Sequence, residues 1–140
     1  MIDSEFTRTT LQELVRIDSR NPGLEADAPG EWELAHHVAD LLQGFGWPAE
    51  VHSLGRPRAN VVARWAGSGQ GQSLMINVHL DTVGTKGMKS PFGGEIRDGR
   101  VYGRGAQDIK GGVRGTHGLG DAPREPRRSE CQPQKLTVSP

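Results

Sequence analysis

Residues Ser73–Asp81, with the sequence SLMINVHLD, decide the fold because an apolar run ends there in a histidine and an aspartate. Residues 73–79 are almost continuously apolar, which is typical of a strand covered on both faces. In open α/β sheets, ligands bind where such a strand gives way to a loop. His79 and Asp81 stand at that position, so the stretch predicts a buried strand that carries chemically active side chains to a site.

The segments around this strand indicate a single α/β domain. Before the strand at residues 73–79, apolar residues first recur at helical spacing, and shorter runs typical of strands come after these helical segments. Residues 95–97 and 100–102 flank Asp98-Gly99, a pair suited to a type I′ turn, and predict a hairpin. Helices are predicted at residues 5–16 and 31–44, and strands at residues 49–54, 60–66 and 73–79. This order predicts an α/β sandwich with a mixed sheet.

Composition and charge exclude several classes of protein. The chain has 140 residues, enough for one domain, and its 17 basic residues balance 17 acidic ones. A net charge of zero does not attract nucleic acid or an anionic membrane. No apolar run approaches the ~20 residues that cross a bilayer, and residues 1–5 lack the basic stretch of a secretory signal. Because Cys131 is the single cysteine, an internal disulfide is excluded. Together, these observations lead us to expect a cytoplasmic protein without nucleic-acid or membrane partners.

His79 and Asp81 have the spacing of a metal ligand and the residue that orients it. An imidazole binds Zn²⁺ through one nitrogen when a hydrogen-bond acceptor holds the other. In an extended backbone, Asp81 points to the same side as His79 and is placed to be that acceptor. The alternative is a histidine at the end of a strand with a solvated acid nearby.

Asp108 lies in the glycine-rich loop Gly103–Gly112. Glycines let the backbone pass close to a neighbour, and a carboxylate on such a turn can bind two ions about 3.5–4 Å apart, one through each oxygen. A phosphate-binding loop is the alternative, but the third glycine of the dinucleotide fingerprint falls on Asp108. The nucleoside-triphosphate motif also fails, because Lys110 follows Ile109 rather than glycine and precedes Gly111 rather than Ser or Thr.

Four segments taken together resemble the dizinc superfamily of acetylornithine deacetylase, succinyl-diaminopimelate desuccinylase, aminoacylase and glutamate carboxypeptidase. They are residues 14–22, 79–83, 90–92 and 98–112. The resemblance covers roughly residues 10–113, in order and with sensible spacing, and is closest to the acetylornithine deacetylase branch. It implies the N-terminal portion of a zinc-exopeptidase-like α/β/α sandwich.

The resemblance also implies a role for each residue of the site. It makes His79 a ligand of one zinc ion, Asp81 the catalytic residue that orients His79, and Asp108 the bridge between two zinc ions, with Co²⁺ as a possible substitute. The implied reaction is the hydrolysis of a linear amide in an N-acyl amino acid or small peptide, as in amino-acid metabolism. Members of the superfamily form homodimers through an inserted domain that is absent from these 140 residues.

The sequence departs from the superfamily in one respect that matters for catalysis. The superfamily requires two adjacent glutamates, a general base and a further zinc ligand, and no Glu-Glu pair occurs in this sequence. We therefore expect this chain to bind zinc weakly or not at all and to be inactive by itself. The alternative is a non-catalytic binding or interaction module that retains the front half of the fold.

Residues 114–140 lose the pattern of the preceding part. They contain few apolar residues and several prolines, with neither helical nor strand periodicity, and therefore predict a disordered tail. In the superfamily, the lysine and two glycines lead into a long apolar helix. We expect residues 1–113 to be the N-terminal part of a catalytic domain and residues 114–140 to be aberrant, as after a frameshift near Val113.

Overall fold

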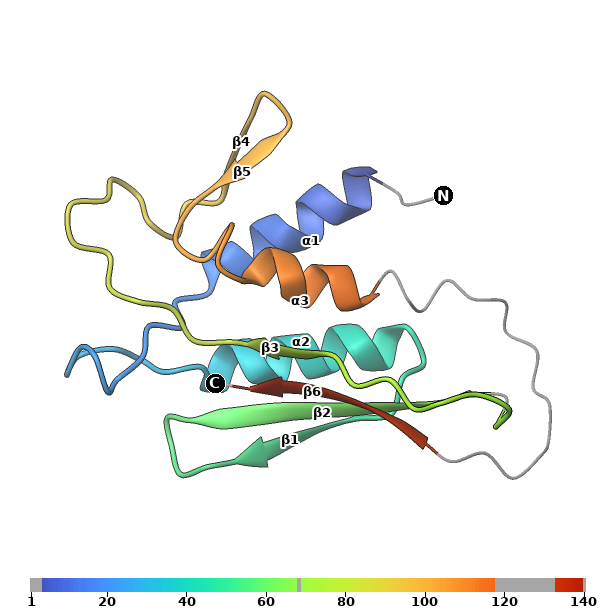
Figure 1. The fold of residues 1–140 in the computed structure, drawn as a ribbon. Coiled ribbons are helices and arrows are strands. Elements are labelled where there is room, and N and C mark those ends of the chain that lie inside the picture. Colours follow the sequence, from blue (N-terminus) through green and yellow to red (C-terminus); the bar gives the residue numbers. More distant parts are fainter. Residues whose placement is uncertain (1–3, 68, 118–132, 140) are drawn as a thin grey trace.

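A computed structural model describes residues 4–67, 69–117 and 133–139 of the chain, with side chains up to residue 113 (Figure 1). The helices are α1 (Ser4–Arg16), α2 (Trp32–Gly44) and α3 (Lys110–His117). The strands are β1 (Ala49–Ser53), β2 (Ala59–Ala66), β3 (Asn77–His79), β4 (Glu95–Arg97), β5 (Arg100–Tyr102) and β6 (Pro133–Ser139). The elements predicted before residue 113 all occur, with bounds that differ most at β3.

The main sheet has the strand order β1-β2-β6-β3. β2 pairs antiparallel with β1 and with β6, whereas β3 pairs parallel with β6, so the predicted mixed sheet is confirmed. Helix α2 packs against β1 and β2, and α3 packs against α1 and β3. In Figure 1, the last residue of β3 and the first residue of α3 lie toward the same end of the molecule.

A continuous apolar core holds the helices on the sheet. Ala35, Val38 and Leu42 repeat at helical spacing on α2 and are completely or almost completely buried, as the sequence pattern predicts. Leu34 on the same helix is also fully buried. They share the core with Val61 of β2 and Val113 of α3, both fully buried. The core therefore includes the helix that follows the glycine-rich loop, which fixes that loop against the sheet.

The hairpin of β4 and β5 forms a separate two-stranded sheet. Ile96 lies opposite Val101, and Asp98 and Gly99 at the turn have φ angles of 51° and 72°. Positive φ at both central residues is the requirement of the type I′ turn that the Asp-Gly pair predicts. The hairpin is therefore confirmed, and its second strand leads directly into the glycine-rich loop.

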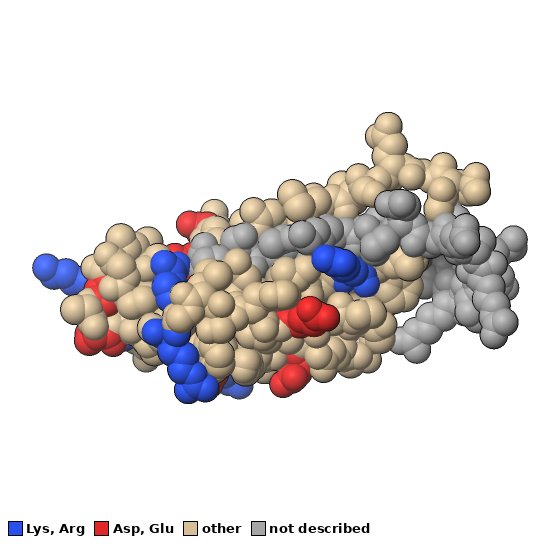
Figure 2. Space-filling view, turned by 90° about the horizontal axis from the view of Figure 1, so that it is seen from below, with Lys and Arg blue, Asp and Glu red and all other residues tan. Residues whose placement is uncertain are grey.

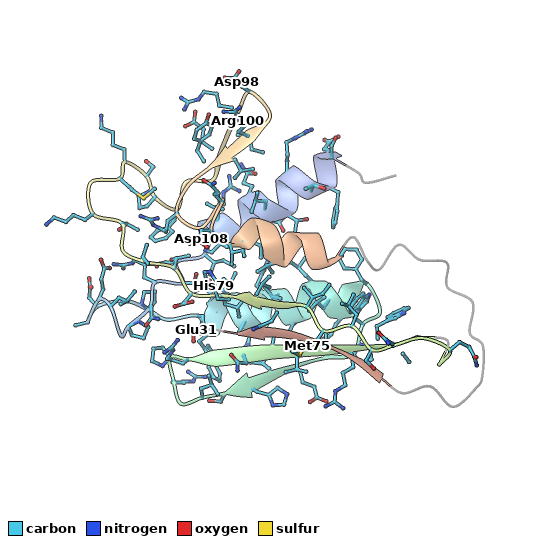
Figure 3. The ribbon with its side chains drawn as sticks, viewed as in Figure 1. Glu31, Met75, His79, Asp98, Arg100 and Asp108 are labelled. Atoms are coloured by element: carbon cyan, nitrogen blue, oxygen red, sulfur yellow. The ribbon has the colours of Figure 1, made fainter. Side chains whose placement is uncertain are left out.

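The strand predicted over residues 73–79 is shorter in the structure. Only Asn77–His79 pair, and they pair with β6 alone, while Leu74 and Met75 are 58% and 62% exposed. A continuous apolar run predicts burial on both faces, but burial requires neighbouring elements. In the part of the chain that the structure describes, none covers the first half of this run, so that the prediction of a fully covered strand is wrong there (Met75 is labelled in Figure 3).

The segment predicted to be an aperiodic tail differs from the structure in two places. Residues 114–117 continue α3, and residues 133–139 form β6 between β2 and β3. The gap between β2 and β3 offers unpaired backbone groups on both sides, and a strand inserted there satisfies them. The composition of residues 114–140 does not reveal that part of this segment can pair as a strand. Residues 118–132 and 140 lie outside the described part of the chain.

The charge distribution agrees with the neutral composition. Figure 2 shows basic and acidic side chains dispersed over the face in view rather than gathered into a patch of one sign. Among the residues that the structure describes, no helix has the length and apolar character needed to cross a membrane.

Candidate metal centre

His79 ends β3, and its imidazole is held through Nδ1. This nitrogen lies 2.9 Å from the backbone carbonyl oxygen of Asp81 and 3.2 Å from the Oδ1 atom of the same residue. Both are acceptors, so a proton on Nδ1 is donated to them, and a neutral ring with its proton there keeps a lone pair on Nε2. The two-residue step from His79 to Asp81 predicts the carboxylate of Asp81 at this place. The backbone carbonyl is an additional acceptor that spacing alone does not reveal.

Asp108 approaches the other side of the same ring. Its Oδ1 atom lies 3.1 Å from Nε2 of His79, and its side chain is 84% exposed. Figure 3 shows the two labelled residues close to one another, one at the end of β3 and the other just before α3. The structure therefore brings together the three residues that the sequence singles out, His79, Asp81 and Asp108.

Gly105 allows the loop that carries Asp108 to pass close to the loop after β3. Its φ angle is +83°, and a Cβ atom there would lie 2.9 Å from Cγ2 of Thr82 and 3.0 Å from the side chain of Lys110. Both the left-handed backbone and the close approach favour glycine. This is the physical reason for glycine at position 105.

The electrostatics of the cluster favour a cation. Partial burial by itself lowers the pKa of His79, but the contacts with Asp81 and Asp108 outweigh this effect and raise that pKa above its ordinary value. Two carboxylates thus surround one imidazole. A positive charge in this place, on the ring or on a bound ion, is stabilised by both of them.

The donor atoms fit part of a zinc site. Zinc lies about 2.0–2.2 Å from histidine nitrogen and carboxylate oxygen, so two ligands of one tetrahedral ion are separated by about 3.3–3.6 Å. Nε2 of His79 and Oδ1 of Asp108, at 3.1 Å, are slightly closer than this. Zinc takes four ligands, or three and a water. Among the described side chains, no group of three or more His, Cys, Asp or Glu residues is arranged to hold an ion. The cluster supplies two donors and one orienting carboxylate.

The segment after α1 braces both ligand-bearing loops through contacts that the sequence did not predict. Ser19 donates its hydroxyl to the carbonyl of Leu80, and Asn21 donates its side-chain amide to Oδ2 of Asp81. Lys110, next to the Asp108 turn, is buried and donates Nζ to the carbonyl oxygen of Ile17 at 2.7 Å. Asn21 reads locally as a turn former, because its partner Asp81 is 60 residues away.

The comparisons with known proteins agree with the fold. Residues 75–118 match the model of Peptidase family M20/M25/M40. A succinyl-diaminopimelate desuccinylase from Cereibacter sphaeroides is 35% identical in an alignment of 99 positions that covers 67% of this chain and 25% of that protein. The chain therefore spans about a quarter of the length of this curated relative.

Two solved structures share the fold. Human carnosine dipeptidase 1 superposes with a TM-score of 0.68 and 19% identity, over 97% of this chain and 32% of that one. The M20 family metallo-carboxypeptidase Sso-CP2 from Sulfolobus solfataricus gives a TM-score of 0.69 and 20% identity, over 99% and 31%. The resemblance and the fold class predicted from the sequence are confirmed: the chain resembles the N-terminal part of these proteins.

Proposed function

We propose, from the premise that this chain carries the N-terminal part of a domain of the Peptidase family M20/M25/M40 type, that its site serves metal-dependent hydrolysis of a linear amide. The observation that supports this most directly is the 3.1 Å separation of Nε2 of His79 and Oδ1 of Asp108. We assign the substrate to N-acyl amino acids or small peptides, as in the acetylornithine deacetylase branch, and the activity to cytoplasmic amino-acid metabolism.

Each residue has a distinct role in this proposal. His79 and Asp108 hold the metal ion, and Asp108 remains accessible for a second ion because its side chain is 84% exposed. Asp81 does not bind metal; it keeps the proton of His79 on Nδ1. When bound, zinc ions lower the pKa of a water ligand and polarise the carbonyl of the amide.

The described residues are not sufficient for this reaction. The sequence contains no pair of adjacent glutamates, and the described side chains supply two donors only. A general base within reach of the water is required in addition. We therefore propose that residues 1–113 contribute one side of an active site, and that the 140-residue chain alone binds zinc weakly and does not hydrolyse amides.

The first experiment measures metal binding by the whole chain. Co²⁺ absorption and Zn²⁺ calorimetry are recorded for the wild type and for His79→Ala, Asp108→Ala and His52→Ala. His52 is a control because it lies on β1 and its side chain is 52% exposed. We expect weak binding that both site variants abolish and His52→Ala leaves unchanged. Binding that is equal in all four proteins contradicts the proposal.

The second experiment supplies the missing share of the site. Residues 1–113 replace the matching segment of the Cereibacter sphaeroides desuccinylase, and the chimera is assayed with N-succinyl-diaminopimelate, N-acetylornithine and dipeptides. We expect a folded, zinc-containing chimera that hydrolyses one of these amides and loses the activity with His79→Ala but not with His52→Ala. A chimera that holds zinc and is inactive on all of them argues against the proposal.

A further inference from the structure

Asn21 extends the cluster by one residue beyond those that contact the proposed ion. Its Nδ2 atom donates to Oδ2 of Asp81 at 2.6 Å, and Oδ1 of the same carboxylate lies 3.2 Å from Nδ1 of His79. We propose that Asn21 is a positioning residue, which fixes the carboxylate of Asp81 and thereby decides which nitrogen of His79 carries the proton. The inference rests on the proposed function for its purpose, but its test does not.

The orientation of the Asn21 amide follows from its surroundings. Its Oδ1 atom accepts a hydrogen bond from the backbone N–H of Gly23 at 2.7 Å, so the NH₂ group is left to face Asp81. A reversed amide would set oxygen against carboxylate and NH₂ against N–H. The backbone N–H of Asn21 also donates to the carbonyl of Thr82 at 2.9 Å, which ties the residue to the loop after β3. Asn21 is therefore a rigid donor rather than a mobile one.

A neutral donor is suited to this place because it orients the carboxylate without neutralising it. Arg20 is adjacent in sequence, yet its guanidinium is occupied by Asp18 at 2.9 Å and Glu25 at 2.6 Å. Among the ion pairs of the described residues, Asp81 pairs with His79 and with no Lys or Arg. The charge of Asp81 is thus directed to the imidazole.

Two carboxylates compete for the single proton of the neutral ring. Asp81 faces Nδ1 and Asp108 faces Nε2, at 3.2 Å and 3.1 Å. If the proton moves to Nε2, it is donated to Asp108 and the lone pair needed for a metal ligand is lost. Asn21 favours Nδ1–H, because it holds the Asp81 carboxylate within reach of that nitrogen. Without Asn21, we expect the Nε2–H tautomer to increase.

The test is the tautomer of His79 in the metal-free full-length chain. Imidazole ¹⁵N shifts of ¹⁵N-histidine-labelled protein are recorded at a pH where the ring is neutral, and His79→Gln identifies the resonances among the five histidines. Two variants are compared. Asn21→Leu removes the donor and the turn, whereas Asn21→Asp keeps an acceptor for the N–H of Gly23 and replaces the donor with a second carboxylate, which repels that of Asp81 instead of holding it.

We expect the Nδ1–H population of His79 to fall at least twofold in both variants. When Asn21→Leu is introduced into the chimera described above, the affinity for zinc should fall about 10- to 100-fold relative to the unchanged chimera. This is the usual effect of removing a residue that orients a metal ligand. Circular dichroism establishes that Asn21→Asp is folded, so it reads out the tautomer even if Asn21→Leu does not fold. An unchanged tautomer in folded Asn21→Asp overturns the inference. A changed tautomer in the full-length chain, together with a chimera that binds no zinc, supports this inference and contradicts the proposed function instead.

Discussion

The Oδ1 atom of Asp108 lies 3.1 Å from Nε2 of His79, although 29 residues separate them in the sequence. His79 is placed by a strand in the main sheet, and Asp108 by a loop between a hairpin and a helix. The loop reaches the strand because Gly105 passes close to Thr82, and because Lys110 and Val113 are buried behind it. The proximity of the two side chains is therefore built into the packing of the domain.

Asp81→Asn should weaken metal binding by about 10- to 100-fold, because an amide no longer provides the charge that holds the Nδ1 proton of His79. The variant changes neither of the proposed donors. Co²⁺ titration of the chimera measures the effect, with Glu50→Gln as the control, since the Glu50 side chain is 79% exposed on β1. Equal affinity in the two variants would mean that Asp81 has no orienting role.

Gly105→Ala should destabilise the fold by about 1–3 kcal/mol, because alanine is strained at a φ angle of +83° and its Cβ meets Thr82 at 2.9 Å. Gly46→Ala is the matched control: its φ angle is +79°, but nothing lies within 4 Å of the added atom. Urea unfolding of both variants separates backbone strain from the close contact. A cost for Gly105→Ala no larger than that for Gly46→Ala would show that the contact relaxes freely.

Leu34→Ala should cost about 2–5 kcal/mol in unfolding free energy, because the side chain is fully buried in the core between α2 and the sheet. Leu24→Ala removes the same atoms from a side chain that is 64% exposed and should change the unfolding free energy little. Thermal or urea unfolding compares the two. Similar effects would argue that α2 does not pack as described.

Lys110 should make stability depend on pH on the alkaline side. Burial lowers the pKa of Lys110 to about 8 from 10.5, although the charge of Asp18 acts in the opposite direction. Between these two values the unfolded chain binds more protons than the folded chain, so the free energy of unfolding rises with pH, by about 3 kcal/mol at most.

The measurement for this prediction is the difference in unfolding free energy between the wild type and Lys110→Met at several pH values. Methionine keeps the length of the side chain and has no charge, so the difference cancels the titration of all other groups. We expect the wild type to gain on the variant as the pH rises from about 8 to 10.5. A difference that stays constant through this window would show that the Lys110 ammonium is not desolvated.

The sequence by itself determines the elements that rest on local patterns. The helical spacing of Ala35, Val38 and Leu42 predicts α2, and Asp98-Gly99 predicts the hairpin turn. The two-residue step from His79 to Asp81 predicts that both lie on one side of the strand end. These features depend on backbone geometry over a few residues, which a sequence records directly.

Tertiary structure alone decided the remaining features. The insertion of β6 between β2 and β3, the exposure of Leu74 and the contact of Asn21 with Asp81 all join or separate segments far apart in the chain. Whether an apolar run is covered depends on which neighbours reach it, and whether an asparagine holds a carboxylate depends on where two loops meet. Local periodicity predicts neither of these features, because contacts between distant segments form only when the whole chain packs.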